Sequence, residues 1–257
     1  MRSTFLSSVT LISVCMALAA TSAEAGTLRT DLTKHLVPLE DIIPGGPPPD
    51  GIPAIDRPVF IAPGAADTWL KSTEPVLAFQ VNGDARAYPL RILIWHEIVN
   101  DTVGGKAVAI TYCPLCNSGL VFDRSVDGKT LDFGTSGMLY KSDLVMYDRQ
   151  THSLWAQMEG RAIVGELAGT RLTPLPANTI AYVDFKAAYP GGKVLSKETG
   201  HRRSYGVNPY DSYDEPDSNP FLLKGPPDRR RPPKERVVGV VVGGAPRAYP
   251  WPGLVKQ

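Results

Sequence analysis

Residues 74–90 read EPVLAFQVNGDARAYPL, and this stretch decides the fold class. Pro75 to Val81 is a short apolar segment rich in branched and aromatic side chains, which favours a buried β-strand. Asn82-Gly83 follows, and this dipeptide is typical of a tight hairpin turn. Residues 86–89 then form a returning strand that ends at proline. The stretch therefore predicts a β-hairpin.

Short strands and turns continue on the C-terminal side of this hairpin. Further strands are expected at residues 106–112 (KAVAITY), 119–124, 130–133, 144–148 and 153–157. Only residues 90–100 have the spacing of a short helix. Gly and Pro number 24 each, which indicates many turns. We therefore predict an all-β fold with minor helix, barrel- or sandwich-like.

Residues 235–251 (ERVVGVVVGGAPRAYPW) repeat the pattern of residues 74–90. Hairpins resemble one another at their turns, but Arg-Ala-Tyr-Pro matches beyond the turn. We infer a hairpin unit used twice. Five parts are expected: a signal peptide (1–25), an irregular Pro/Gly-rich entry segment (26–60), a main β-rich domain (61–210), a linker or surface loop (211–234) and the start of a second β repeat (235–257). Because the sequence ends at Gln257, this second repeat is expected to be truncated.

The first 25 residues have the layout of a secretory signal peptide. Arg2 precedes an apolar stretch from Phe5 to Ala20, and Ala23-Glu24-Ala25 is a small-x-small cleavage site. We expect cleavage after Ala25 and a periplasmic or extracellular mature protein, with a retained membrane anchor as the alternative. Lipid attachment at Cys15 is not expected.

The formal net charge is +1, which lacks the basic excess of a nucleic-acid-binding protein. No other apolar run approaches membrane-spanning length, so no integral membrane segment is expected after signal cleavage. We predict no nucleic-acid partner, and the sequence indicates no other partner.

Residues 111–118 read TYCPLCNS, and Cys113 and Cys116 are the only cysteines after Cys15. A strand leads into the pair, and Asn117 suits the left-handed backbone that ends a tight turn. Such a knuckle directs backbone amides at two sulfurs. Soft sulfur donors favour copper, and a Cys/His set also suits zinc. We predict a metal site, with copper first and zinc as the alternative.

Two cysteines cannot complete a four-thiolate site, so the other ligands must be His, Met or carboxylate. His96 precedes the cysteines by one hairpin-sized step and is the favoured third ligand. The less favoured histidines are His152, His201 and His35, and the candidates for a weak axial ligand are Met138, Met146 and Met158.

Two alternatives use the same cysteines without metal. Cys-Pro-x-Cys resembles the spacing of thioredoxin-like oxidoreductases, but their pair opens a helix that activates the first thiol, and no helix is predicted here. A structural disulfide in a non-catalytic binding module would close a very short loop and add little stability. Nucleophile-elbow, Rossmann and phosphate-loop motifs are absent, so the sequence leaves open whether the protein is an enzyme.

The chain resembles domain-of-unknown-function family 3179. The segments that carry the resemblance are WHEIVND (95–101), TYCPLCNSGLVFDR (111–124), FGTSGMLYKSDLVMYDRQTHSLWAQ (133–157) and VLSKETG (194–200) with the following NPY (208–210). The resemblance implies that His96, Cys113 and Cys116 belong together, and it draws attention to Asp101, Asp123, Asp148, Ser153, Trp155 and Gln157. His152 stands at a position that varies among members, and members generally continue past the second Ala-Tyr-Pro. The family carries no established activity.

Overall fold

The computed structural model describes residues 27–254, except positions 211, 214, 216, 217, 219, 221 and 227. The predicted signal peptide and the end of the chain at Gln257 lie outside the described residues. Within the described part of the chain, no helix has the length and apolar character needed to span a membrane.

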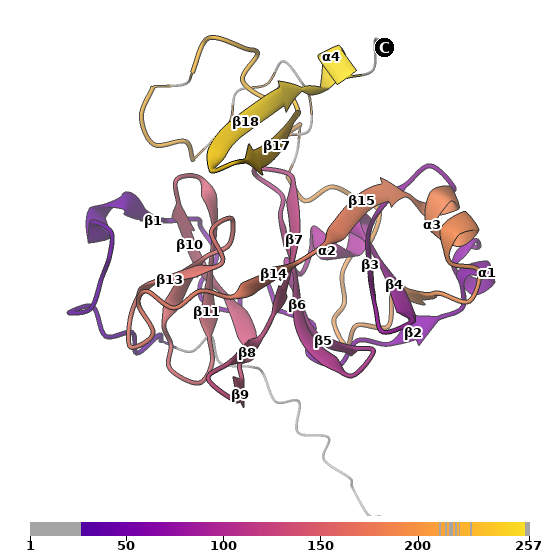
Figure 1. Ribbon diagram of the computed structural model, residues 1–257, viewed down its shortest axis with the longest axis horizontal. Coiled ribbons are helices and arrows are strands. Elements are labelled where there is room, and N and C mark those ends of the chain that lie inside the picture. Colours follow the sequence, from indigo (N-terminus) through magenta and orange to yellow (C-terminus); the bar gives the residue numbers. More distant parts are fainter. Residues whose placement is uncertain are drawn as a thin grey trace, which may run out of the picture.

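Three β-sheets build the body of the protein, and Figure 1 shows them side by side. The first sheet has the order β15 (Ala177–Ala181), β3 (Pro75–Val81), β4 (Asp84–Pro89), β16 (Lys193–Leu195) and β2 (Phe60–Ile61). The middle sheet has the order β14 (Thr173–Leu175), β7 (Ser118–Asp123), β6 (Lys106–Cys113) and β5 (Ile98–Val103). The third has the order β1 (Ile42–Pro44), β10 (Phe133–Tyr140), β11 (Asp143–Asp148), β12 (Leu154–Ala156) and β13 (Arg161–Val164).

The remaining elements are short. They are the 3-10 helix η1 (Leu39–Asp41), the helices α1 (Pro63–Ala66), α2 (Leu90–Leu93), α3 (Tyr182–Ala188) and α4 (Trp251–Leu254), and the two-stranded pairs β8 (Ser125–Val126) with β9 (Lys129–Thr130) and β17 (Val237–Val242) with β18 (Ala245–Pro250). The prediction of an all-β fold with minor helix is confirmed. No sheet closes on itself among the described residues, which favours a sandwich-like arrangement over a barrel.

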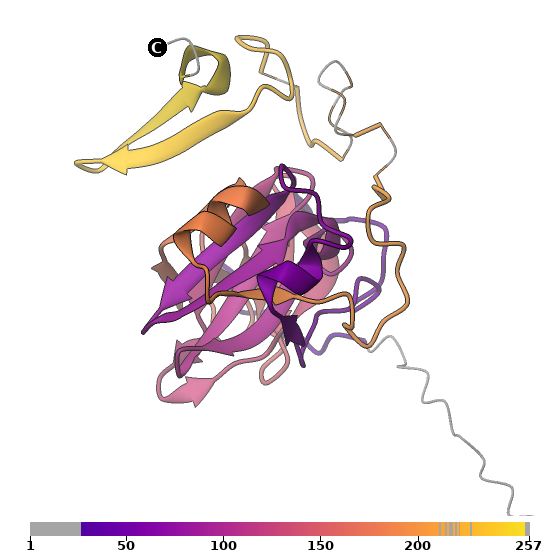
Figure 2. The same cartoon turned by 90° about the vertical axis from the view of Figure 1, so that its right-hand side faces the viewer.

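The hairpin predicted at residues 74–90 is β3–β4, with Val81 opposite Asp84. Asn82 and Gly83 both have positive φ, 51° and 80°, as the tight turn requires. The repeat forms the hairpin β17–β18, so the prediction of a second copy is also confirmed. Its surroundings differ, because Val76 of β3 is fully buried whereas Val237 of β17 is 52% exposed. Figure 2 shows the second hairpin on one side of the three sheets.

The middle sheet has an apolar core on each face. Along β6, Ile110 packs into the core shared with Leu77 and Tyr88 of the first sheet. The preceding residue, Ala109, packs into the core that holds Trp155 of the third sheet. Successive side chains point to opposite faces of a strand, so a strand covered on both faces is apolar at almost every position. This explains the run KAVAITY.

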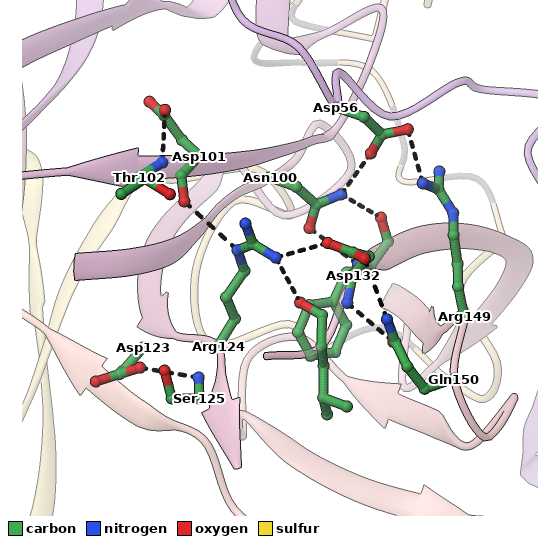
Figure 3. A network of polar contacts seen from close by, with 12 residues as sticks. Asp56, Asn100, Asp101, Thr102, Asp123, Arg124, Ser125, Asp132, Arg149 and Gln150 are labelled. Carbon is green, nitrogen blue, oxygen red and sulfur yellow. Dashed lines mark hydrogen bonds and ion pairs between the residues drawn. The ribbon is translucent and has the colours of Figure 1, made fainter. Parts of the chain in front are cut away.

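A buried amide joins the middle sheet to the third (Figure 3). The Asn100 side chain on β5 donates to the carbonyl oxygen of Phe133 at the start of β10, and its oxygen accepts a hydrogen bond from the Phe133 backbone amide. The same amide group donates to Asp56, which forms an ion pair with Arg149. Asn100 is 4% exposed, so the two sheets are held by backbone-like hydrogen bonds in a dry environment.

We expect Asn100→Ala to lower the free energy of unfolding by roughly 2–5 kcal/mol, because it leaves the buried Phe133 amide and carbonyl without partners. Urea denaturation measures the change. The matched control is Asn178→Ala, an exposed position on β15, where a change within about 0.5 kcal/mol is expected. Equal losses in the two variants would show that the amide does not hold the sheets together.

Candidate metal centre

The cysteines lie on a tight turn between β6 and β7. Cys113 ends β6 and pairs with Ser118, the first residue of β7. Asn117 has φ 51°, which is the left-handed backbone that the sequence predicts at this position. Its side-chain oxygen accepts a hydrogen bond from the Tyr112 hydroxyl at 3.0 Å. The turn is therefore fixed from both of its ends.

Both sulfurs are free thiols, and no disulfide links them. Cys113 is 1% exposed, whereas Cys116 lies at the surface. The Cys116 thiol donates to Asp143 Oδ1 at 3.1 Å and lies 3.0 Å from the Ser118 hydroxyl. The inert structural disulfide considered from the sequence is not what the structure shows.

Asp143 comes from the third sheet, at the first position of β11. The backbone amide of Met158 donates to its Oδ2 at 2.8 Å, which leaves Oδ1 toward Cys116. One donor atom from each of Cys113, Cys116 and Asp143 lies within 4.8 Å of the other two. These three residues are close enough to hold a metal ion. Sequence reasoning missed Asp143, although it lies inside the segment 133–157 that carries the family resemblance.

His96 has other partners. Its Nδ1 donates to the carbonyl oxygen of Pro53 at 2.7 Å, and its Nε2 accepts from the Tyr205 hydroxyl at 2.6 Å. Burial lowers the pKa of His96 to about 4, which matches a neutral ring with one donor and one acceptor nitrogen. The donor group at the cysteines thus contains Asp143 and not His96. Ligation by His96 stays a prediction, and it would require the imidazole to leave Pro53 and Tyr205.

The other sequence candidates are spread over the fold. The His201 ring lies beside that of His96, with centroids 5.4 Å apart. His152 Nδ1 accepts from the Arg29 amide, and His35 Nδ1 bonds the carbonyl oxygen of Val37. Of the methionines, Met146 is buried in a core, Met158 is exposed and Met138 lines a pocket beside Cys113.

The residues singled out by resemblance mostly support the scaffold. Asp101 forms an ion pair with Arg86 and accepts a hydrogen bond from the Tyr88 hydroxyl. Asp123 forms an ion pair with Lys106. Asp148 accepts hydrogen bonds from Trp155 and Thr151, and the Ser153 hydroxyl accepts one from the Leu167 amide. Trp155 shares an apolar core with Cys113, and Gln157 is linked to the cysteine turn by hydrogen bonds. Its Oε1 accepts from the Ser118 hydroxyl, which contacts Cys116, and its Nε2 donates to Thr111 on β6.

The titratable side chains at the site are acids, and none of the described basic side chains forms an ion pair with them. The hydrogen bond with Cys116, burial and the neighbouring acids raise the pKa of Cys113 well above its ordinary value. Burial raises the pKa of Asp143, and it raises that of Glu97 to about 7. In the described part of the chain neither carboxyl group forms an ion pair, although both are buried. Burying an acid without a cation favours its protonated form.

Glu97 lies next to His96 but faces the cysteine side of the molecule. Its backbone is left-handed, with φ 59°, and its carbonyl oxygen accepts from the Tyr112 amide at 2.7 Å. Glu97 is 6% exposed. Its carboxyl group accepts a hydrogen bond from the Tyr210 hydroxyl at 2.9 Å, and the residue lines a pocket together with Cys113.

In metal-free protein, the pH dependence of stability should report on Glu97. Its folded-state pKa of about 7 exceeds the ordinary 4.5, so its contribution is complete below about pH 4.5 and is lost as the pH rises through 7. Glu97→Gln removes this titration. Between pH 5 and 8 the variant should gain roughly 3 kcal/mol relative to wild type in chemical denaturation. The exposed Glu166→Gln is the matched control, and a pH-independent difference for Glu97→Gln would contradict the assignment.

The comparisons with known proteins agree with the resemblance seen in the sequence. No curated protein and no solved structure matches the chain. A family model described as "Protein of unknown function (DUF3179)" matches residues 49–257, a range that contains the cysteine turn, Glu97 and Asp143. The chain therefore belongs to the DUF3179 family.

Proposed function

We propose that this protein binds a metal ion through Cys113, Cys116 and Asp143. The observation that carries the proposal is the clustering of these three acids, two of them buried, with no side-chain cation paired to Asp143 among the described residues. Buried acidic groups are costly unless a positive charge compensates them. A metal ion would supply that charge and would replace the protons that the isolated site retains.

The spacing of the donors supports this proposal. Zinc–sulfur and zinc–oxygen bonds of about 2.3 and 2.0 Å place neighbouring ligand atoms of a tetrahedral site about 3.5 Å apart. Cys116 Sγ and Asp143 Oδ1 are 3.1 Å apart, and all three donor atoms fall within 4.8 Å. Small side-chain shifts would therefore suffice for ligation.

The donor set bears on the choice of metal. The two sulfurs suit copper, as the sequence predicts, and they suit zinc equally. A carboxylate as third ligand is a harder donor than imidazole and is common at zinc, so Asp143 moves the preference toward zinc. Three protein donors leave a fourth position open, which fits metal handling, electron transfer or catalysis of an oxidation at copper, and Lewis-acid chemistry at zinc. Location outside the cytoplasm is part of the same proposal.

Thiol–disulfide exchange receives less support. An attacking cysteine in that chemistry is accessible and has a lowered pKa. Cys113 is buried with a raised pKa, and β7 follows the pair instead of a helix.

Elemental analysis of the purified protein tests the proposal. We expect about one equivalent of zinc or copper in wild type and none in Cys113→Ser/Cys116→Ser. Asp143→Asn should weaken the affinity by about tenfold or more, since a neutral amide is a poorer ligand. His96→Gln is the matched comparison, because His96 is the ligand predicted from sequence.

Each outcome is decisive for a different part of the proposal. Wild-type protein without metal after exposure to both ions, with thiols that cycle reversibly in glutathione, would establish the exchange alternative. Loss of metal in His96→Gln but not in Asp143→Asn would replace the carboxylate by the imidazole.

A further inference from the structure

Glu97 occupies a position that disfavours its own side chain. A left-handed backbone costs a residue with a Cβ atom roughly 1–2 kcal/mol, and Gly or Asn would relieve this cost. Complete burial of an acid adds a second cost. The Glu97 backbone hydrogen bonds to Leu93 and Tyr112 would be equally available to glycine. Neither backbone geometry nor packing explains a glutamate here, and strain at a buried polar residue is typical of functional sites.

Glu97 lines a pocket that has both polar and apolar lining residues. The polar lining residues are Glu97, Cys113, Thr135 and Tyr210, and the apolar ones include Pro47, Ile52, Leu115, Met138, Leu139 and Leu144. The cavity volume is about 90 Å³. At 10–15 Å³ for each water-sized sphere, this space admits a molecule of on the order of six non-hydrogen atoms. The lining comes from the entry segment, Glu97, the cysteine turn and the β10–β11 hairpin, together with Tyr210 and Leu222 further along the chain.

We propose that this pocket binds a small molecule that has a short apolar part and one hydroxyl group, with the hydroxyl hydrogen-bonded to Glu97 beside Cys113. The pocket shares Cys113 with the candidate metal centre, and it does not need the ion to form. The apolar walls match an alkyl group, and burying that group is favourable at about 0.8 kcal/mol for each methylene. The polar groups fix the orientation of the ligand, as is usual when a few polar groups converge in an apolar pocket.

Propan-1-ol and methoxyethane provide the first test, because they share one molecular formula and only the alcohol has an O–H group. Ligand titrations followed by protein NMR, in metal-free protein with chelator, measure both affinities. We expect the alcohol to bind about tenfold more tightly than the ether, as one hydrogen bond to a buried acid predicts.

Variants separate the ligand contact from folding. Glu97→Gly relieves the left-handed backbone but loses the hydrogen bond from Tyr210, so its folding is checked by urea denaturation, and the folded variant should lose the tenfold preference for the alcohol. Met138→Trp should fill the pocket and abolish binding of both compounds. Glu166→Gln, an exposed acid, is the matched control and should bind as wild type does.

The contrary results are equally specific. Equal affinities for alcohol and ether, or a preference for the alcohol retained in Glu97→Gly, would each overturn the proposal. Because every measurement uses metal-free protein, absence of a metal centre would leave this result unaffected, and failure to bind alcohol would leave metal binding unaffected.

Discussion

The candidate centre depends on the hydrogen bonds that Asn100 makes to Phe133. The cysteines belong to the middle sheet and Asp143 belongs to the third, so the site exists only while these two sheets keep their relative position. Apolar packing presses the sheets together but tolerates sliding, since it is not directional. The paired amide hydrogen bonds are directional and lie in a buried environment, where a misaligned pair would be costly. A polar tie inside an apolar interface thus sets the register on which the donor geometry relies.

Destabilising features are gathered in one region. Glu97 is buried, acidic and left-handed, Asp143 is a buried acid, and Cys113 is a buried thiol facing them. On either side of this region the middle sheet is covered by continuous apolar cores. Such cores give a domain enough stability to tolerate a few kcal/mol of local cost. The distribution is that of a rigid support around a strained polar site, which is how binding and catalytic centres are commonly built.

Local patterns made much of the fold predictable, whereas the third donor was not. The Asn-Gly turn at residues 82–83 and the left-handed Asn117 follow from backbone sterics within a few residues, and both were predicted. Asp143 reaches Cys116 across 27 positions and from another sheet, so its proximity depends on sheet packing that no short pattern encodes. The role of His96 as a ligand stays a prediction, and its neighbour Glu97 lines the pocket beside Cys113. Reversal of the chain at Glu97 directs the imidazole to Pro53 and Tyr205 and the carboxyl group to the pocket.

The entry segment has a consequence for the order in which the protein assembles. Residues 27–58 contribute β1 to the edge of the third sheet, a bridge from Ile55 to Val99, the Pro53 carbonyl that holds His96, and Asp56 beneath Asn100. Its partners extend along the chain to Val164 on β13, which His35 bridges, and to Lys224, which pairs with Asp41. These contacts therefore close long loops, at a cost in chain entropy that is recovered only late in folding. During synthesis this segment emerges before every strand that it binds. It therefore stays unpaired until β5, β10 and β13 have been synthesised, and its docking is a late step in folding.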